Sequence, residues 1–170
     1  MGTGGVLLRK LRAKVTDEPT DFGWIYGGKL AASGFPSSKD QVRWLARRGV
    51  NSILTLTEFA LPAEWLNEEK IKVKQIPIQD HTLPSPDVLD EAASYIEDEV
   101  KSGRTILVHC LAGKGRTGLA LVAYMMKTEG MTARGAIDLL RKKRPGSVER
   151  EQERSVLEYE TFLRQRTPGA

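Results

Sequence analysis

The sequence contains very little cysteine and histidine, the residues that most often build metal centres and disulfide frameworks. Cys110 is the only cysteine in the chain, and there are two histidines. A single cysteine excludes an intramolecular disulfide framework and any zinc site built from several cysteines. With no cluster of histidine or cysteine, we expect no bound metal and no cofactor.

Long apolar runs are also missing. No stretch approaches about 18 consecutive apolar residues, so the sequence predicts no membrane-spanning helix and no stable membrane insertion. The first residues lack the pattern of a secretory signal, and we expect a soluble cytoplasmic protein. No repeat or Pro/Gly/Ser-rich linker divides the chain. We therefore expect a single domain over residues 21–166, preceded by an extension or short basic helix over residues 1–20.

Neither sign of charge dominates the composition. Lysine and arginine number 26 and aspartate and glutamate 22, which gives a formal net charge of +4. This mild surplus favours anionic partners such as phosphate esters, although an ordinary basic surface also accounts for it. Charge alone does not select a function.

Short segments typical of strands and helices alternate along the chain. Residues 52–57, 71–78 and 104–109 are rich in β-branched or apolar side chains and predict strands, and residues 24–31 predict a small hairpin. Helices are expected over residues 38–48, 62–69, 86–101, 118–126, 132–144 and 148–164. This alternation predicts an α/β fold with a central, mainly parallel sheet of about four to five strands flanked by helices.

The stretch VHCLAGKGRTG, residues 108–118, leads from a predicted strand through a glycine-rich loop into a predicted helix. The glycines permit backbone conformations that let successive N–H groups converge on an oxyanion. The amino terminus of the helix adds partial positive charge, and the arginine supplies a planar fork for two phosphate oxygens. The sequence thus predicts an anion-binding cup with Cys110 at its floor. Its predicted binding residues are Leu111, Ala112, Gly113, Lys114, Gly115 and Arg116.

The same positive field acts on the sulfur of Cys110. Helix amino termini and nearby cations favour the thiolate form of a cysteine, so we expect Cys110 to be a nucleophile able to attack phosphorus. His109 is interpreted as an organiser whose imidazole hydrogen-bonds carbonyl groups of the loop. Thr117 is expected to donate its hydroxyl to the sulfur and ease its departure when a phosphocysteine breaks down.

HCLAGKGRTG resembles the H-C-x-x-G-x-x-R-[ST] signature of the protein tyrosine phosphatase superfamily. The surrounding chain is similar to the small dual-specificity branch of that superfamily, including atypical and archaeal members. Weaker similarities in FGWIYGGKLAASGFP, PIQD and IDLLRKKRPGSV extend the resemblance over nearly the whole domain. The resemblance implies the cysteine-based phosphatase fold and a phosphomonoester hydrolase that works through a phosphocysteine intermediate.

Other interpretations of the loop explain less of it. A nucleotide-binding P-loop needs G-x-x-x-x-G-K-[ST], whereas Val108 stands at its first glycine position and Gly115 follows Lys114. A buried inert cysteine explains neither the glycines nor Arg116. Rhodanese-like folds also place a cysteine in an anion-binding loop, but they explain neither PIQD nor RTG.

The resemblance further implies a general acid on a loop about thirty residues before the cysteine, which protonates the leaving group and later activates water. Asp80 fits this position because it follows the predicted strand and I-P-I-Q, where the family often has I-P-x-D. Asp87 and Asp90 are better explained as charges at a helix amino terminus. We interpret His81 as a loop residue.

Many members of the family carry a glutamine after an R-P-G segment, where it positions the hydrolytic water. The resemblance therefore implies Gln152, within RPGSVEREQERS, as a possible water-positioning residue. Its spacing from Val148 is one residue shorter than usual. Glu149 and Glu153 are alternatives for the side chain that faces the site.

The substrate depends on the depth and charge of the cup. A chain this short lacks room for large recognition insertions, which favours a permissive site for phosphotyrosine proteins and also for phosphoserine and phosphothreonine. Lys114 resembles the second loop lysine of tensin-like phosphoinositide phosphatases, but Leu111 stands where the first would be. Phosphoinositides or inositol phosphates are thus the alternative, and a non-catalytic phosphoprotein-binding module is a third hypothesis. We expect no nucleic acid as a partner.

The basic run at residues 141–144 would suit a lipid headgroup. Its ordinary interpretation is a solvated helix face with cations at the carboxyl end of the helix.

Overall fold

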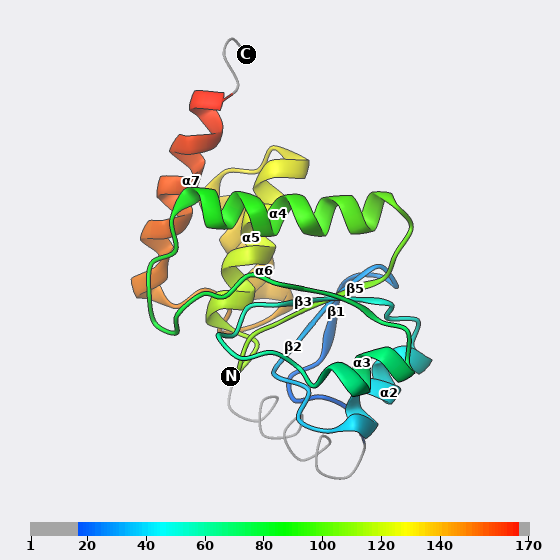
Figure 1. Ribbon diagram of the computed structural model, residues 1–170. Coiled ribbons are helices and arrows are strands. Elements are labelled where there is room, and N and C mark those ends of the chain that lie inside the picture. The colour runs from blue at the N-terminus through cyan, green and yellow to red at the C-terminus, as the bar shows by residue number, and fades with distance from the viewer. Residues whose placement is uncertain (1–16, 167–170) are drawn as a thin grey trace.

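The computed structural model describes residues 17–166, so most of the expected basic segment at the start of the chain lies outside the described residues. A five-stranded sheet with the order β1-β2-β5-β3-β4 forms the centre of the molecule (Figure 1). Its strands are β1 (Gly23–Tyr26), β2 (Leu30–Ser33), β3 (Ser52–Thr55), β4 (Lys72–Gln75) and β5 (Ile106–His109). All neighbouring strands run parallel except the β1–β2 hairpin. The predicted α/β fold with a mainly parallel sheet is confirmed.

Helices cover both faces of this sheet (Figure 1). The pair α2 (Lys39–Arg47) and α3 (Ala63–Glu68) lies on one face. The larger layer on the other face consists of α4 (Pro86–Lys101), α5 (Gly115–Glu129), α6 (Ala133–Lys143) and α7 (Glu153–Arg166), the last preceded by a single 3₁₀ turn, η1 (Arg150–Gln152). None of the helices within the described range is long and apolar enough to cross a membrane.

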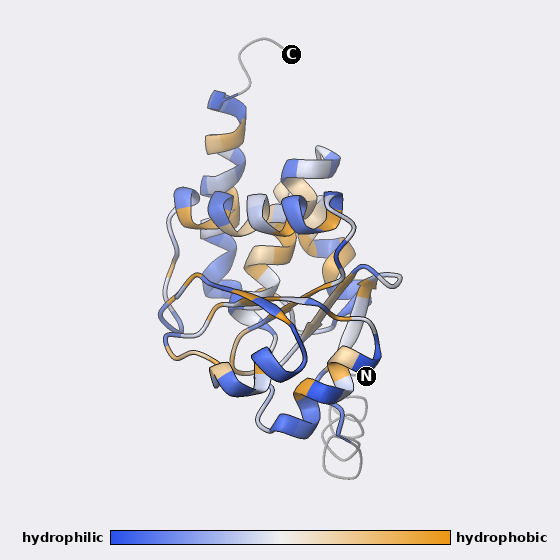
Figure 2. Ribbon diagram, turned by 45° about the vertical axis from the view of Figure 1, so that its right-hand side comes forward, coloured by the Kyte–Doolittle hydropathy of each residue, from blue (hydrophilic) through white to orange (hydrophobic). Residues whose placement is uncertain are grey.

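The alternation of side chains along the central strands produces two separate cores. Ile106 and Val108 of β5 contact the large helical layer, whereas Leu107 between them contacts the side of α2 and α3. Leu54 and Ile53 of β3 divide in the same way. Strands buried on both faces read as continuous apolar runs, which is why ILV and SIL predict strands without a polar face. Figure 2 shows the apolar residues gathered between the layers.

Capping residues set the predicted helix starts. The Ser38 hydroxyl accepts the N–H of Gln41 at 3.2 Å, and the Thr132 hydroxyl accepts the N–H of Gly135 at 3.1 Å. Gly49 and Gly103, each just after a helix, have φ angles of +88° and +84°. This is the left-handed conformation that glycine adopts without steric strain at a helix end. These boundaries confirm the sequence-based expectations.

Several boundaries differ from expectation. The helix after Cys110 begins at Gly115 and not at residue 118, so the loop is tighter than predicted. The last helix begins at Glu153 and not at residue 148, where a φ of +59° excludes a right-handed helix, and residues 150–152 form the 3₁₀ turn η1. The strand predicted over residues 71–78 is only Lys72–Gln75, and Val73 is 44% exposed because this strand lies at the sheet edge.

Candidate active site

The loop that contains Cys110 lies at the carboxyl end of the central strand β5. The neighbouring strands β2 and β3 end beside it, since His109 pairs with both Ser33 and Thr55. Three parallel strands therefore present their carboxyl ends to the same place, where ligands bind in sheets of this kind. Cys110 follows β5 directly and is buried.

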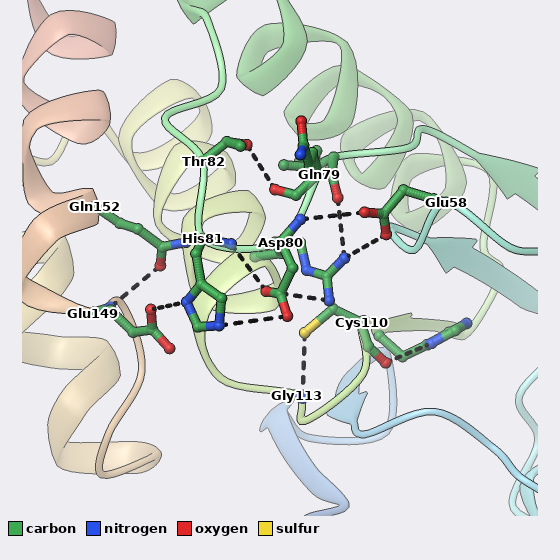
Figure 3. A network of polar contacts seen from close by, with 12 residues as sticks. Glu58, Gln79, Asp80, His81, Thr82, Cys110, Gly113, Glu149 and Gln152 are labelled. Atoms are coloured by element: carbon green, nitrogen blue, oxygen red, sulfur yellow. Dashed lines mark hydrogen bonds and ion pairs between the residues drawn. The ribbon is translucent and has the colours of Figure 1, made fainter.

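Gly113 gives the loop its shape. Its φ of +75° lies in the left-handed region, and a Cβ at this position would lie 2.5 Å from the backbone of Ser33. Only glycine satisfies both constraints. In this conformation the Gly113 N–H donates to the sulfur of Cys110 at 3.2 Å (Figure 3). The backbone thus turns inward over the sulfur, as the cup requires.

The start of α5 supplies further donors to the same place. Within residues 17–166, the backbone N–H groups of Lys114, Gly115 and Arg116 donate to no other residue. The first N–H groups of a helix have no partner inside the helix, and with the macrodipole they attract an anion. These donors and the Gly113 N–H lie where the sequence predicts a receptor for an oxyanion.

The guanidinium of Arg116 is buried and held on several sides. Its Nη1 donates to Glu58 Oε2 at 2.9 Å and to the Ile78 carbonyl at 3.0 Å. Its Nη2 lies 3.3 Å from Asp80 Oδ1. Arg116 is therefore fixed between the end of β3 and the loop that follows β4, in the first turn of α5 above Cys110.

Glu58 also contacts Arg116, although no motif in the sequence singles it out. This residue stands three positions beyond the end of β3, at the same sheet edge as Cys110. Hydrogen bonds from its own backbone N–H, from the Asp80 N–H and from Arg116 lower the pKa of the Glu58 carboxyl. Its position after the parallel strand SILT was the available signal, because side chains that follow such strands line the binding edge.

Asp80 lies at the mouth of the cup, on the loop after β4. Its side chain is about half exposed, and its Oδ1 faces Arg116 and accepts the N–H of His81 at 3.1 Å. Figure 3 shows His81 between Asp80 and Glu149, with the imidazole Nδ1 3.2 Å from Glu149 Oε2. The structure thus brings the predicted acid and the predicted arginine together and adds contacts for His81.

His109 is buried beneath the loop. Burial lowers the pKa of His109 to about 4; the Arg116 charge acts in the same direction and the hydrogen bond to the Cys110 carbonyl opposes it. The neutral ring must carry its proton on Nδ1, because the Cys110 carbonyl 3.1 Å away can only accept. Its Nε2 then accepts from the Thr55 hydroxyl at 2.9 Å. These contacts match the predicted organiser.

The Thr117 hydroxyl does not make the hydrogen bond that the sequence predicts. It is buried and forms no hydrogen bond with any described residue, so the predicted donation to the sulfur of Cys110 is not made in this conformation. A buried hydroxyl without a partner is costly. Thr117 is thus left with a donor that a sulfur or a ligand can satisfy.

The three candidates for the water-positioning side chain, Gln152, Glu149 and Glu153, have different contacts. The buried side chain of Gln152 lies against Gly115, and its Oε1 accepts the Glu149 N–H at 3.4 Å. Glu149 reaches His81, whereas Glu153 pairs with Arg141 at 2.8 Å. Gln152 thus adjoins the start of α5 at Gly115, Glu149 contacts the loop after β4, and Glu153 is held by Arg141.

The basic run at residues 141–144 is not a single solvated face. Arg141 donates to the carbonyl groups of Ser147 and Val148, and Arg144 is only 3% exposed. Two of its four cations are thus used inside the fold. The expectation that the whole run faces solvent or a lipid headgroup is wrong. No group of three or more potential metal ligands occurs in the part of the chain that the structure describes.

Solved structures identify the class to which this fold and site belong. The active form of Tk-PTP superposes with a TM-score of 0.74 at 32% identity, covering 82% of this chain and 96% of that one. PTPMT1 superposes with a TM-score of 0.75 at 19% identity, which supports the fold alone. The fold is that of the cysteine-based phosphatases, as the resemblance implied.

The family follows from the sequence comparison. Residues 19–157 match the model PTP-SAK, "Swiss Army Knife protein, DSP-PTPase phosphatase domain". This chain belongs to that family, and to the dual-specificity branch of the protein tyrosine phosphatase superfamily.

Curated relatives agree with this assignment. The dual specificity protein phosphatase Mpk3 of Drosophila melanogaster is 31% identical over 74% of this chain and 31% of its own length. Dual specificity protein phosphatase 1 of Arabidopsis thaliana is 31% identical over 71% of this chain and 57% of its own length. The phosphatidylglycerophosphate phosphatase PTPMT2 of the same plant is 29% identical over 82% of this chain and 61% of its own length. This chain thus spans between about a third and three fifths of these relatives.

Proposed function

We propose that this chain hydrolyses phosphomonoesters on proteins, phosphotyrosine above all and also phosphoserine and phosphothreonine, through a phosphocysteine. One observation carries the proposal. The sulfur of Cys110 lies under the N–H of Gly113, at the floor of a loop whose next three N–H groups have no acceptor in the described chain. A phosphoryl group seated on these donors presents its phosphorus to the sulfur.

In the first step the Cys110 thiolate attacks phosphorus, so that an S–P bond forms while the P–O bond to the leaving group breaks. The loop N–H groups and Arg116 hold the non-bridging oxygens, where charge is concentrated in the transition state. Asp80 gives its proton to the departing oxygen. Because Asp80 lies 3.3 Å from Arg116, the acid stands beside the bound phosphoryl group.

In the second step Asp80, now a carboxylate, takes a proton from water, and the water oxygen attacks phosphorus. The S–P bond breaks, and inorganic phosphate and the Cys110 thiolate are released. The contact of Gln152 with Gly115 supports a role in orienting this water. The unpartnered hydroxyl of Thr117 supports its proposed donation to the departing sulfur.

Apolar side chains at the mouth support an aromatic phosphate ester. Leu111 and Phe59 are 53% and 51% exposed, and each directly follows a residue of the site. Phe35 joins them, because its ring lies 5.1 Å from that of Phe59 and its N–H donates to the Leu111 carbonyl at 3.0 Å. An exposed apolar rim suits the ring of phosphotyrosine better than a hydroxyl-rich inositol.

Phosphoinositides remain the second candidate because of one side chain. Lys114 is half-buried in the loop and matches one of the loop lysines of tensin-like phosphatases. The chain is also similar to the lipid phosphatase PTPMT2. A charge in the loop would suit a second phosphate on the substrate.

The cytoplasmic location expected from the sequence stays a prediction, which cell fractionation tests.

The deciding experiment compares kcat/KM for phosphotyrosine, phosphoserine and phosphothreonine peptides and for soluble phosphoinositides. We expect the highest kcat/KM with phosphotyrosine and a smaller preference for it in Phe59→Ser. Val73→Ser, which alters a similarly exposed apolar side chain on β4, should leave that preference unchanged. A preference for phosphoinositides that Lys114→Ala abolishes would favour the second candidate. No turnover of any of these esters would contradict both.

A further inference from the structure

Arg144 lies at the end of a basic run and yet points into the protein. Its Nη1 donates to the backbone carbonyl of Asp21 at 2.8 Å, and its Nη2 donates to Asp21 Oδ2 at 2.8 Å. The same Nη2 donates to the Gly113 carbonyl at 2.6 Å. Arg144 therefore joins the segment before β1 to the loop over Cys110.

The hydrogen bond to the Gly113 carbonyl fixes the direction of the next N–H group. The peptide bonds of the described chain are trans, and a trans peptide directs its C=O and its N–H to opposite sides. With the Gly113 carbonyl turned out to Arg144, the Lys114 N–H points away from Arg144. It donates to no other described residue, and the Gly113 N–H beside it faces the sulfur.

Asp21 is itself held firmly. The preceding residue, Thr20, accepts the Gly34 N–H at 2.7 Å, and Gly34 adjoins the loop, because a Cβ there would lie 3.0 Å from the Leu111 carbonyl. Asp21 adopts a φ of +54°, an unusual conformation for a residue other than glycine. A buried arginine needs a partner for its charge, and Asp21 supplies it.

We propose that Arg144, held by Asp21, is a positioning residue of the phosphate-binding loop. By keeping the Gly113 carbonyl outside the loop, it keeps the Lys114 N–H directed at the phosphoryl group. Without Arg144 the Gly113–Lys114 peptide is free to rotate, and the loop loses an oriented donor before the substrate binds. This inference rests on the proposed function, because it assumes that the loop binds phosphate.

The experiment measures how well inorganic phosphate protects Cys110, the only thiol, from alkylation by iodoacetamide. In Arg144→Met we expect half-protection to need roughly tenfold more phosphate than in the wild type, the usual effect of losing one hydrogen bond to a charged group. Arg144→Lys, which keeps the charge but not the fork, should fall between them. Tyr159→Phe is the matched control, since it removes a partly buried hydrogen bond to Asp90 between α7 and α4.

The control separates positioning from stability, because a merely structural Arg144 would alter phosphate protection no more than Tyr159→Phe does. If Arg144→Met does not fold, Asp21→Asn decides, with an expected shift of about threefold from the weakened charge pair. Unchanged protection in the folded Arg144 and Asp21 variants would overturn the inference. Absence of phosphate protection in the wild type would instead contradict the proposed function.

Discussion

Glu58 accepts a hydrogen bond from Nη1 of Arg116 at 2.9 Å, whereas Asp80 Oδ1 lies 3.3 Å from Nη2 of the same guanidinium. The arginine is thus shared by two carboxylates from different loops. One carboxylate has a pKa lowered by its hydrogen bonds and by Arg116, so it stays ionised while it holds the cation. That division agrees with the proposed role of Asp80 as the group that transfers a proton.

Replacing Glu58 with glutamine should lower kcat/KM for an aryl phosphate about threefold to tenfold. A neutral amide forms a weaker hydrogen bond with the guanidinium than a carboxylate does, so Arg116 is held less firmly. Steady-state kinetics at neutral pH provide the measurement. Glu64→Gln on α3 is the control, and equal rates in the two variants would exclude a role for Glu58.

Replacing Cys110 with serine should reduce hydrolysis by on the order of a thousandfold or more, because the alcohol is a far weaker nucleophile at neutral pH. Phosphate binding should be nearly unchanged, since the loop N–H groups remain. Turnover and equilibrium binding of phosphate are measured on the same preparation. Turnover at the wild-type level would rule out Cys110 as the nucleophile.

Replacing Asp80 with asparagine should slow the reaction according to the leaving group. Alkyl phosphates, which need a proton on the departing oxygen, should lose about a hundredfold or more, whereas activated aryl phosphates should lose much less. The two rates are compared for wild type and variant. An unchanged rate with an alkyl phosphate would remove Asp80 from the mechanism.

Burial of His109 makes the free energy of unfolding depend on pH. The folded pKa, about 4, lies below the unfolded value of 6.5, so between these values the unfolded chain binds the extra proton. Stability should therefore be full above 6.5 and fall as the pH decreases toward 4, by at most ~1.4 kcal/mol per pH unit. Urea unfolding of wild type and His109→Asn at several pH values tests this. Parallel curves for the two proteins would contradict it.

Chelation should leave activity unchanged, because the proposed steps need only Cys110, Arg116, Asp80 and water. Activity is measured before and after dialysis against EDTA. Loss of activity that a divalent cation restores would contradict a reaction without metal.

The sequence predicted most of the fold because its strongest signals are local. Apolar strands, the Ser38 and Thr132 caps and the glycines after helices each act over a few residues. The strand predicted over residues 71–78 is longer than β4, because the alternating burial continues to Ile76 and Ile78. The residues paired with β3 end at Gln75. Local periodicity does not reveal where a partner strand stops.

The residues of the candidate site also fall into two groups, those within one local motif and those that the fold brings together. The loop around Cys110 is one continuous motif and was predicted from spacing and glycine. Glu58 and Arg144 act across the fold, and nothing in the few residues around either one indicates its partner. In the sequence Arg144 is part of a basic run, because a sequence shows the charge of a side chain and not its direction.

The pairing of Asp21 with Arg144 spans 123 positions of the chain, and the carbonyl that Arg144 grips lies 31 positions before it. During synthesis from the amino terminus, Cys110 and its glycine loop therefore leave the ribosome well before Arg144 does. A nascent chain that ends short of Arg144 carries the whole signature motif but lacks the peptide orientation on which we propose phosphate binding to depend. Phosphate binding should then reach its full strength only when Arg144, the residue after α6, has been added.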